Sequence, residues 1–208
     1  MTPTKEKILT SAIALFNTRG LTSVTMKQIA DDLKMSPGNL TYHYKTKALL
    51  LEEIYQRMDA ESKDYILPGG YLTLHHFETM MMNYYEMGLR YRFFFQDVVH
   101  MVREYPQVGK MYEASNLSRF KEGRDLVDYY VETDRMVPSS PPIDYDKLVY
   151  TLWMLSAFWF SQEQIIVSER YRVNKVLPIE MLWQQLFPFL TPKGWEEYRQ
   201  IKQYAPLP

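Results

Sequence analysis

Apolar residues recur at helical spacing along nearly the whole chain, and this period limits the folds open to it. One stripe runs from Ile8 to Phe16 and a second from Met26 to Leu33. Apolar residues three and four positions apart lie on one face of an α-helix, whereas a half-buried strand alternates with a period of two. No strand-like alternation persists, so the sequence predicts an all-α protein.

Residues with strong positional preferences divide the chain up to the Glu61–Asp64 region into four helices. Gly20 closes the first helix, and Thr25 caps the second, with Gln28 three residues later as in a capping box. A short third helix runs from Pro37 to Tyr44, and a fourth starts near Lys47. This spacing, with a tight turn between the second and third helices, is typical of a helix-turn-helix.

Beyond these helices, Pro68-Gly69-Gly70 interrupts the chain close to the expected domain boundary. We expect an N-terminal helix-turn-helix domain over residues 1–58 and a C-terminal helical domain over residues 59–208. Proline-containing breaks in the second domain predict helices near 71–89, 92–103, 106–134, 143–171, 178–190 and 193–204.

The third helix contains residues that a short helix would ordinarily avoid. Gly38, Asn39 and Thr41 are poor helix formers, and Tyr42 and His43 follow them. At about 100° per residue, Leu40 and Tyr44 fall on the side that faces the second helix, and most of the polar residues fall on the other. Gly38 permits a close backbone approach, and the polar side chains can bond to phosphates or base edges.

The run from Phe16 to Leu50 resembles the DNA-binding head of the tetracycline repressor (TetR) family. The shared features are a glycine that ends helix one, a threonine before helix two, an Ile-Ala-x-x-Leu core and the pattern Ser-x-Gly-x-Leu-x-Tyr-x-aromatic-x-x-Lys-x-x-Leu. The match covers about the first 55 residues. A softer similarity to some regulators of this family lies in Phe93–Asp97 and Arg103–Pro106.

The resemblance implies which residues contact DNA, position by position. In this chain they are Thr25, Lys27, Ser36, Pro37, Gly38, Asn39, Thr41, Tyr42, His43 and Lys47. Lys47 would hold a phosphate from the start of helix four. The chain departs from the family at Thr41, where a tyrosine is common, and at Tyr44, where phenylalanine or valine is common.

Charge and composition are consistent with this assignment. Residues 1–58 carry eight Lys/Arg against five acids, a net of +3, whereas the other 150 residues carry sixteen against twenty, a net of −4. A mildly basic head on an acidic body suits anion binding at one end. The chain has no cysteine, its N-terminus has no apolar signal region, and its longest nearly apolar run, 148–160, is too short to span a bilayer. We expect a cytoplasmic protein that does not enter the membrane.

Less specific interpretations exist for several of these residues. The aromatic residues from Tyr42 to Tyr44 could form a patch that packs on helix four, and Lys45 and Lys47 could be ordinary solvated lysines. The adjacent His75 and His76 cannot easily chelate one metal ion from a helix, so no metal site is expected. The sequence contains no nucleophile elbow, phosphate-binding glycine loop or dinucleotide fingerprint, and we expect no catalytic residues and no cofactor.

The second domain is rich in tyrosine and methionine, which suits a pocket for an apolar or aromatic small molecule. The competing interpretation is a solid core in which these side chains touch one another. The candidate lining residues are Met80, Tyr84, Phe94, His100, Met101, Tyr112, Trp153, Phe158, Trp159 and Gln162.

Two apolar segments near the C-terminus predict a dimer contact. Residues 148–160 are apolar nearly all round, so a helix there must be covered on most sides. The following helix carries a second stripe, with Leu182, Trp183, Leu186 and Phe187 as the candidate interface residues. Pairing both helices with symmetry mates would give the two-fold arrangement that a palindromic operator requires.

The sequence thus predicts a transcriptional repressor that binds double-stranded operator DNA as a homodimer. The resemblance implies that an effector in the body changes the separation of the two heads and releases DNA. One alternative is a dimeric DNA-binding protein with no ligand. Another is a helical enzyme or carrier whose head no longer binds DNA.

Overall fold

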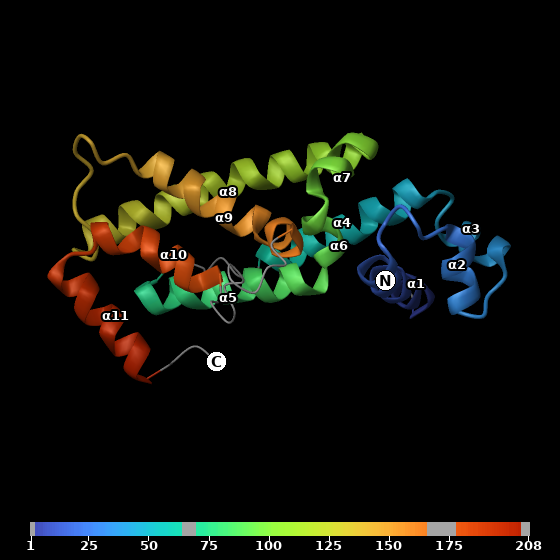
Figure 1. The fold of residues 1–208 in the computed structure, drawn as a ribbon, viewed down its shortest axis with the longest axis horizontal. Helices are drawn as coiled ribbons and strands as arrows, with labels where there is room; N and C mark the ends of the chain where they lie inside the picture. The colour runs from blue at the N-terminus through green and yellow to red at the C-terminus, as the bar shows by residue number, and fades with distance from the viewer. Residues whose placement is uncertain (1–2, 64–69, 166–177, 205–208) are drawn as a thin grey trace.

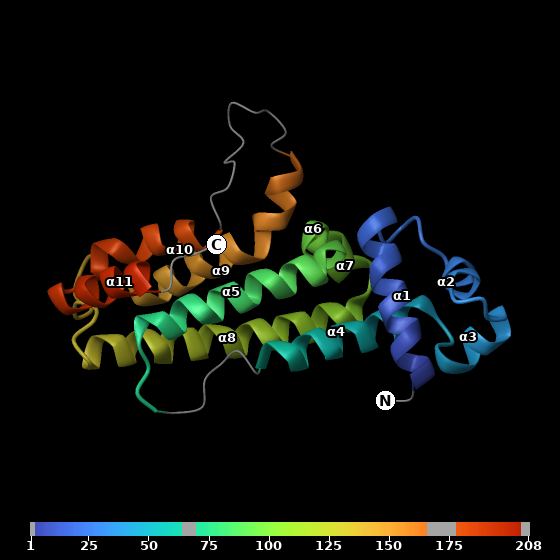
Figure 2. The same ribbon diagram turned by 90° about the horizontal axis from the view of Figure 1, so that it is seen from below.

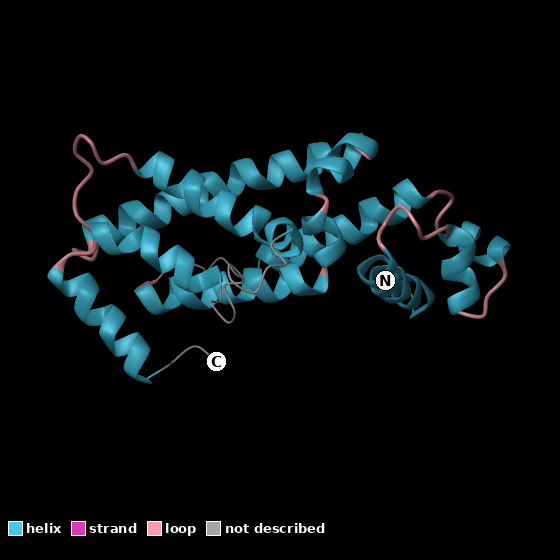
Figure 3. Cartoon of the chain, in the orientation of Figure 1, coloured by secondary structure: helices cyan, strands magenta, loops and turns pink. Residues whose placement is uncertain are grey.

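The computed structural model describes residues 3–63, 70–165 and 178–204. Every regular element in these ranges is a helix, apart from one isolated antiparallel bridge between Met136 and Leu190 (Figure 3). The all-α prediction is therefore confirmed. Within the same ranges, no helix combines the length and the hydropathy that crossing a bilayer requires.

Four helices form the head and its connection to the rest of the chain. They are α1 (Pro3–Arg19), α2 (Met26–Asp32), α3 (Pro37–His43) and α4 (Lys47–Lys63). Gly20 ends α1 in the left-handed conformation, at φ +79°, and its N–H donates to the carbonyl of Phe16 at 2.9 Å. A glycine adopts this φ without the steric penalty that a Cβ imposes, which is why α1 ends there.

The body is built from seven further α-helices and one short 3₁₀ turn in the described ranges. They are α5 (Leu74–Arg90), α6 (Arg92–Gln96), α7 (Val98–Glu104), α8 (Pro106–Glu132), α9 (Tyr145–Ile165), α10 (Pro178–Leu186), η1 (Phe187–Phe189) and α11 (Pro192–Tyr204). The helix expected over 92–103 is divided in two, because Asp97 leaves the helical conformation at φ −137°. The expected helix over 143–171 is observed as far as Ile165, and its remainder lies outside the described residues.

The molecule is elongated, with the head at one end of its long axis (Figure 1). Helices α5, α8 and α9 run along the body, and α11 lies at the end far from the head in both views (Figures 1 and 2). Helices α6 and α7 lie beside the ends of the long body helices that are nearest the head. This order places the cavity described below between the head and the distal end.

Two clusters of buried side chains stabilise the chain. The proximal core combines the apolar faces of α1 to α4 with residues of α5 to α8, from Ile8 to Val108. The distal core, from Leu74 to Ile201, joins α5, α8, α9, α10 and α11. Because the proximal core contains residues of both the head and the body, their packing is continuous.

Helix α4 belongs to both parts of the chain. Its first half buries Leu50 and Ile54 with the head, and Tyr55 further along contacts the rings of Phe94 and Tyr112. The domain boundary expected at residue 58 falls inside this helix, which continues through that position without a break.

The start of α11 is fixed on the turn that follows α8. The Thr191 N–H donates to the Arg135 carbonyl at 3.1 Å, and Thr191 Oγ1 donates to the Asp134 carbonyl at 2.6 Å. Gly194 lies so close that a Cβ there would be 2.2 Å from the Arg135 carbonyl oxygen. Only a glycine fits at this contact without a backbone shift.

Replacing Gly194 with alanine should therefore destabilise the protein. We expect Gly194→Ala to lower the free energy of unfolding by about 1–3 kcal/mol, because the backbone must move to relieve the overlap. Urea unfolding followed by circular dichroism measures it. Gly38→Ala is the matched control, since a Cβ there meets no atom within 4 Å. Equal stability of the Gly194 variant and the natural protein would contradict the tight packing of α11.

Candidate DNA-binding face and body cavity

Caps at both helices define the turn between α2 and α3. The Gln28 N–H donates to Thr25 Oγ1 at 3.2 Å and Gln28 Oε1 accepts from the Thr25 N–H at 2.7 Å, so the predicted capping box is present. After α2, Lys34 takes a left-handed conformation at φ +54°, and the Met35 N–H donates to the Ala30 carbonyl at 3.0 Å. The turn thereby fixes the angle at which α3 leaves α2.

Helix α3 has the two faces that its sequence predicted. Leu40 and Tyr44 are buried, with 1% and 3% of their surface exposed. Gly38, Asn39 and Tyr42 are exposed, and Tyr42 reaches 83%. The exposed face carries polar groups on a rigid scaffold, as a base-reading surface requires.

Some polar atoms of this surface are engaged inside the helix and others are not. Ser36 Oγ caps α3 by accepting from the Asn39 N–H at 3.2 Å, and Thr41 Oγ1 donates to the Pro37 carbonyl at 2.8 Å. The side chains of Asn39 and Tyr42 have no hydrogen-bond partner among the described residues. They are therefore the groups of α3 that remain available for DNA.

The other predicted contact residues surround α3 with different exposure. Thr25 and Lys27 are exposed at the start of α2, and His43 is half-buried with its ring 5.3 Å from that of Tyr42. Tyr44 packs into the proximal core, and burial, with smaller effects from Glu53 and Glu6, raises its pKa to about 12. The aromatic residues 42–44 thus divide between the core and the surface.

Lys47 does not point freely toward solvent. Its Nζ donates to the carbonyls of Leu21 and Val24, the latter at 2.7 Å, and lies 5.3 Å from the centre of the Phe16 ring. Burial lowers the pKa of this lysine. The structure therefore places its ammonium on the connection between α1 and α2, whereas Lys45 is exposed.

The head and the body meet at a polar contact beside the proximal core. Asn17 of α1 donates from Nδ2 to the Arg90 carbonyl at 2.8 Å and accepts at Oδ1 from the Phe93 N–H at 2.9 Å. These two bonds attach α1 to the junction of α5 and α6. The rings of Phe16 and Phe93 pack next to it, with centroids 5.2 Å apart.

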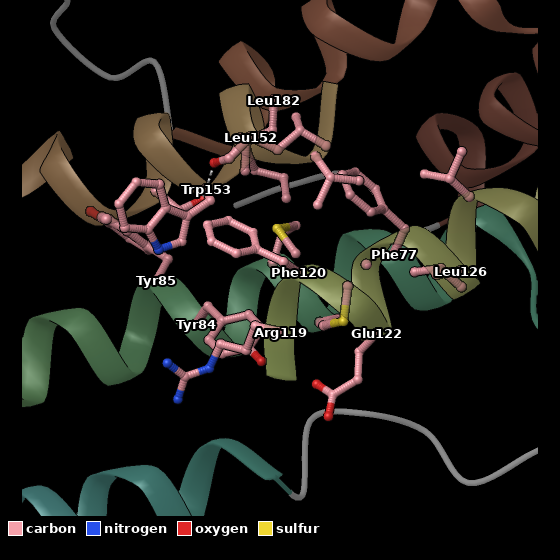
Figure 4. Close-up of a pocket in the computed structure, with 18 of the residues that line it drawn as sticks. Phe77, Tyr84, Tyr85, Arg119, Phe120, Glu122, Leu126, Leu152, Trp153 and Leu182 are labelled. Atoms are coloured by element: carbon pink, nitrogen blue, oxygen red, sulfur yellow. Dashed lines mark hydrogen bonds between the residues drawn. The ribbon is translucent and has the colours of Figure 1, made fainter. Parts of the chain in front are cut away.

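A cavity of about 600 Å³ lies inside the body, with walls from α5, α8, α9 and α10. Its apolar walls include Phe77, Phe120, Leu152 and Leu182, which Figure 4 shows around a common space. This volume falls within the usual range for small-molecule sites.

Five of the ten side chains predicted for a pocket line this cavity: Met80, Tyr84, Tyr112, Trp153 and Trp159. The other five lie elsewhere. Phe94 and Met101 are buried in the proximal core, and Phe158 packs against that core and against Trp153. His100 is half-buried on α7, and Gln162 is exposed on α9.

Most of the α8 wall was missed from the sequence. Asn116, Arg119, Gly123 and Leu126 follow Tyr112 at spacings of three or four residues, and Phe120 lies next to Arg119, which places them along one helix face. These residues could have been predicted by continuing the helical spacing of three or four residues from Tyr112 toward the C-terminus of the helix. Glu122 lies beside this face and also lines the cavity.

The predicted dimer residues require a correction. Leu182, Trp183 and Leu186 are buried within one chain, each at most 3% exposed, in the distal core. The Trp183 ring lies 5.3 Å from that of Phe77, and Phe187 packs on the same core. Leu182, Trp183 and Leu186 therefore face the chain's own core, whereas Phe187 is half-buried and stays a predicted contact.

Exposed side chains on α9 form a different stripe, which continues along the helix. Its positions recur every three or four residues and are Lys147, Thr151, Met154, Phe158, Gln162 and Ile165; all are exposed except Phe158, which is half-buried against the proximal core. Met154 is 46% exposed and Ile165 is 69% exposed. Apolar side chains of this size along a solvent-facing helix indicate an interaction surface.

The exposed polar face of α3 on a helix-turn-helix scaffold defines a DNA-binding protein, and comparisons with known proteins identify its family. Residues 8–54 match the family model described as "Bacterial regulatory proteins, tetR family", and residues 50–198 match the model described as "Bacterial transcriptional repressor". The chain belongs to the TetR family and is a DNA-binding transcriptional repressor.

Individual relatives agree with this assignment. The chain is 27% identical over 178 residues to the negative transcriptional regulator of the biofilm operon icaADBC, IcaR, from Staphylococcus epidermidis, covering 79% of this chain and 89% of that protein. A TetR-family regulator from Marinobacter aquaeolei has the same fold, with a TM-score of 0.86 at 22% identity over 97% and 98% of the two chains. A second, from a Rhodococcus species, gives a TM-score of 0.68 at 14% identity over 91% and 100%.

Lys47 should contribute to the stability of the head before any DNA binds. We expect Lys47→Met to lower the free energy of unfolding by about 1–3 kcal/mol, because two backbone carbonyls lose their charged donor. Urea unfolding without DNA measures the change. Lys45→Met, at an exposed position, should stay within about 0.5 kcal/mol of the natural protein. If both variants are equally stable, Lys47 does not stabilise the head, and its expected role is that of a phosphate contact only.

Proposed function

We propose that this repressor binds a pseudo-palindromic operator as a homodimer and that an apolar or aromatic small molecule in the body cavity regulates this binding. The observation that supports DNA binding is the exposed polar face of α3. Its N-terminal residues, Gly38 and Asn39, are exposed where a recognition helix contacts base edges. Tyr42 and the exposed Lys27 are placed to bond to the flanking phosphates.

The cavity supports the regulatory part of the proposal. A void of about 600 Å³ between the two cores is large for a chain of 208 residues, since interiors are ordinarily packed with few voids larger than a water molecule. A ligand there touches α5, whose end at Arg90 accepts a hydrogen bond from Asn17 of the head. Regulation requires that the ligand bind the DNA-competent and DNA-free states with different affinities.

Homodimers are typical of the family, and the α9 stripe is the surface that we assign to the contact. Its exposed apolar members, Met154 and Ile165, lie with Phe158 on one side of the helix. A two-fold axis along this stripe would bring the same side chains of two chains together. The arrangement leaves both α3 helices available for two half-sites.

Gly38→Ala separates DNA contact from folding. The added methyl meets no atom within 4 Å in the protein alone, so stability should be unchanged or slightly raised. We expect operator affinity to fall by about tenfold or more, because the methyl prevents close approach of the α3 backbone to DNA. Fluorescence anisotropy on an operator selected from random duplexes measures it.

The control for this experiment is Leu117→Ala, at an exposed position on α8. Its operator affinity should equal that of the natural protein. Asn39→Ala should in addition reduce discrimination at particular base pairs, by about 1–3 kcal/mol each. Unchanged affinity and discrimination in both head variants would show that α3 does not enter the groove.

Met154→Glu tests the dimer contact. A carboxylate at the centre of the stripe would be desolvated against its copy in the partner chain, so we expect a monomer at micromolar concentration and loss of operator binding. Analytical ultracentrifugation gives the oligomeric state. Leu117→Glu places the same charge on α8, and this variant should remain a dimer. A dimeric Met154 variant, or a monomeric natural protein, would exclude this surface.

A further inference from the structure

One carboxylate oxygen of the cavity lining has no hydrogen-bond partner among the described residues. Glu122 of α8 lines the cavity, and Glu122 Oε1 accepts from Ser118 Oγ at 2.9 Å. The second carboxylate oxygen, Oε2, is buried and has no hydrogen-bond partner among the described residues. A buried carboxylate oxygen without a donor is costly, so such groups are rare and concentrate where a ligand supplies the missing bond.

The other charged side chains that line the cavity have partners. Arg119 donates to Asp59 at 3.2 Å and to Ser62 at 2.8 Å, and its guanidinium lies 5.9 Å from the Tyr84 ring centre. Asp125 accepts from Lys121 at 2.6 Å. The Nδ1 atom of His76, a titratable group of the wall, accepts from the Thr73 N–H at 2.9 Å.

The arrangement of these groups gives Glu122 no ion-pair partner among the described residues. Figure 4 shows the Arg119 guanidinium and the Glu122 carboxylate at the edge of the cavity, both directed away from Phe120 and Trp153. The two groups form no ion pair in the described part of the chain, and Arg119 is instead neutralised by Asp59 of α4. Glu122 therefore forms no ion pair among the described residues, and a cationic ligand would supply one.

We propose that the cavity binds a hydrophobic amine whose ammonium donates to Glu122 Oε2. This inference rests on the proposed effector site and specifies the chemistry of its ligand. The apolar part of the ligand would lie against Phe120, Met81 and Trp153. Aromatic walls also attract a cation through their ring faces.

The same features disfavour the other ligand classes. A carboxylate or phosphate in the cavity would face Glu122 with no free guanidinium to bind it, because Arg119 is engaged by Asp59 and Ser62. A neutral alcohol could donate one hydrogen bond but would leave the carboxylate charge uncompensated. The amine satisfies both the missing bond and the charge, and charge-assisted bonds are about twice as strong as neutral ones.

Three probes of equal chain length test the proposal: decylamine, decanol and decanoate, each below its micelle-forming concentration. Tryptophan fluorescence reports binding, since Trp153 and Trp159 line the cavity. We expect the full-length protein to bind decylamine about tenfold or more tightly than decanol, and decanoate most weakly. In Glu122→Gln, decylamine should bind no better than decanol, while decanol should keep its affinity.

A matched variant controls for the acidic surface. Glu113 is exposed on the same helix, so Glu113→Gln removes the same charge without changing the cavity, and the preference for decylamine should persist. Equal binding of the three probes, a preference for decanoate, no binding of any probe, or an unchanged preference in Glu122→Gln would each overturn the proposal.

Operator binding by the same preparations, measured without any probe, keeps the two proposals apart. A protein that binds operator but shows no preference for the amine retains its proposed DNA-binding function and loses this ligand class. A protein that binds decylamine through Glu122 but binds no operator supports the ligand site and contradicts the proposed function.

Discussion

The packing of the head onto the start of the body determines how every other part of the molecule is placed. Phe16 of α1 meets Phe93 of α6, and Tyr55 of α4 meets Phe94, with ring centroids 5.2 and 5.6 Å apart. Asn17 adds two hydrogen bonds at the same contact. The orientation of α3 is therefore tied to the body through α1 and α4. A separate head on a flexible linker would have no means of sensing the cavity.

Several buried charged side chains of the distal core are paired with one another. In the distal core, Glu78 accepts from Trp183 Nε1 at 2.6 Å and from Lys202 at 2.7 Å, and Arg135 donates from Nε to Glu197 at 2.6 Å. These partners make burial of the charges tolerable. Around the cavity, the Tyr112 hydroxyl and Glu122 Oε2 are buried without partners among the described residues. In the distal core, Arg135 Nη1 is likewise buried without a hydrogen-bond partner among the described residues, so unsatisfied polar atoms occur at both places.

The sequence was most informative where local signals determine structure. The capping box at Thr25, the end of α1 at Gly20 and the two faces of α3 depend on residues a few positions apart, and each was predicted correctly. The apolar stripe of α10 was interpreted as a dimer contact. An amphipathic helix has the same sequence pattern whether its apolar face packs on its own chain or on a partner. Glu122 gave no signal at all, since its surroundings come from helices distant in the sequence.

Lys47 shows a related limit of a family motif. The motif places a lysine at this position, and the sequence cannot distinguish an ammonium bound to phosphate from one bound to the carbonyls of Leu21 and Val24. Half of the predicted pocket residues line the cavity for a similar reason. Composition identified the aromatic and methionine-rich helices, but the direction of each side chain depends on how those helices pack.

The two ends of α5 are held in different ways, and this asymmetry determines how the helix can move. At its start, Tyr130 Oη donates to the Thr73 carbonyl at 2.9 Å and the Leu74 N–H donates to Glu197 at 3.2 Å, so this end is fixed to the distal core. The other end, about 25 Å away for a 17-residue helix, meets the head through Asn17. If the proposed ligand widened the space between α5 and α8, the fixed end at Thr73 would act as a pivot and the displacement would be greatest where Arg90 meets α1.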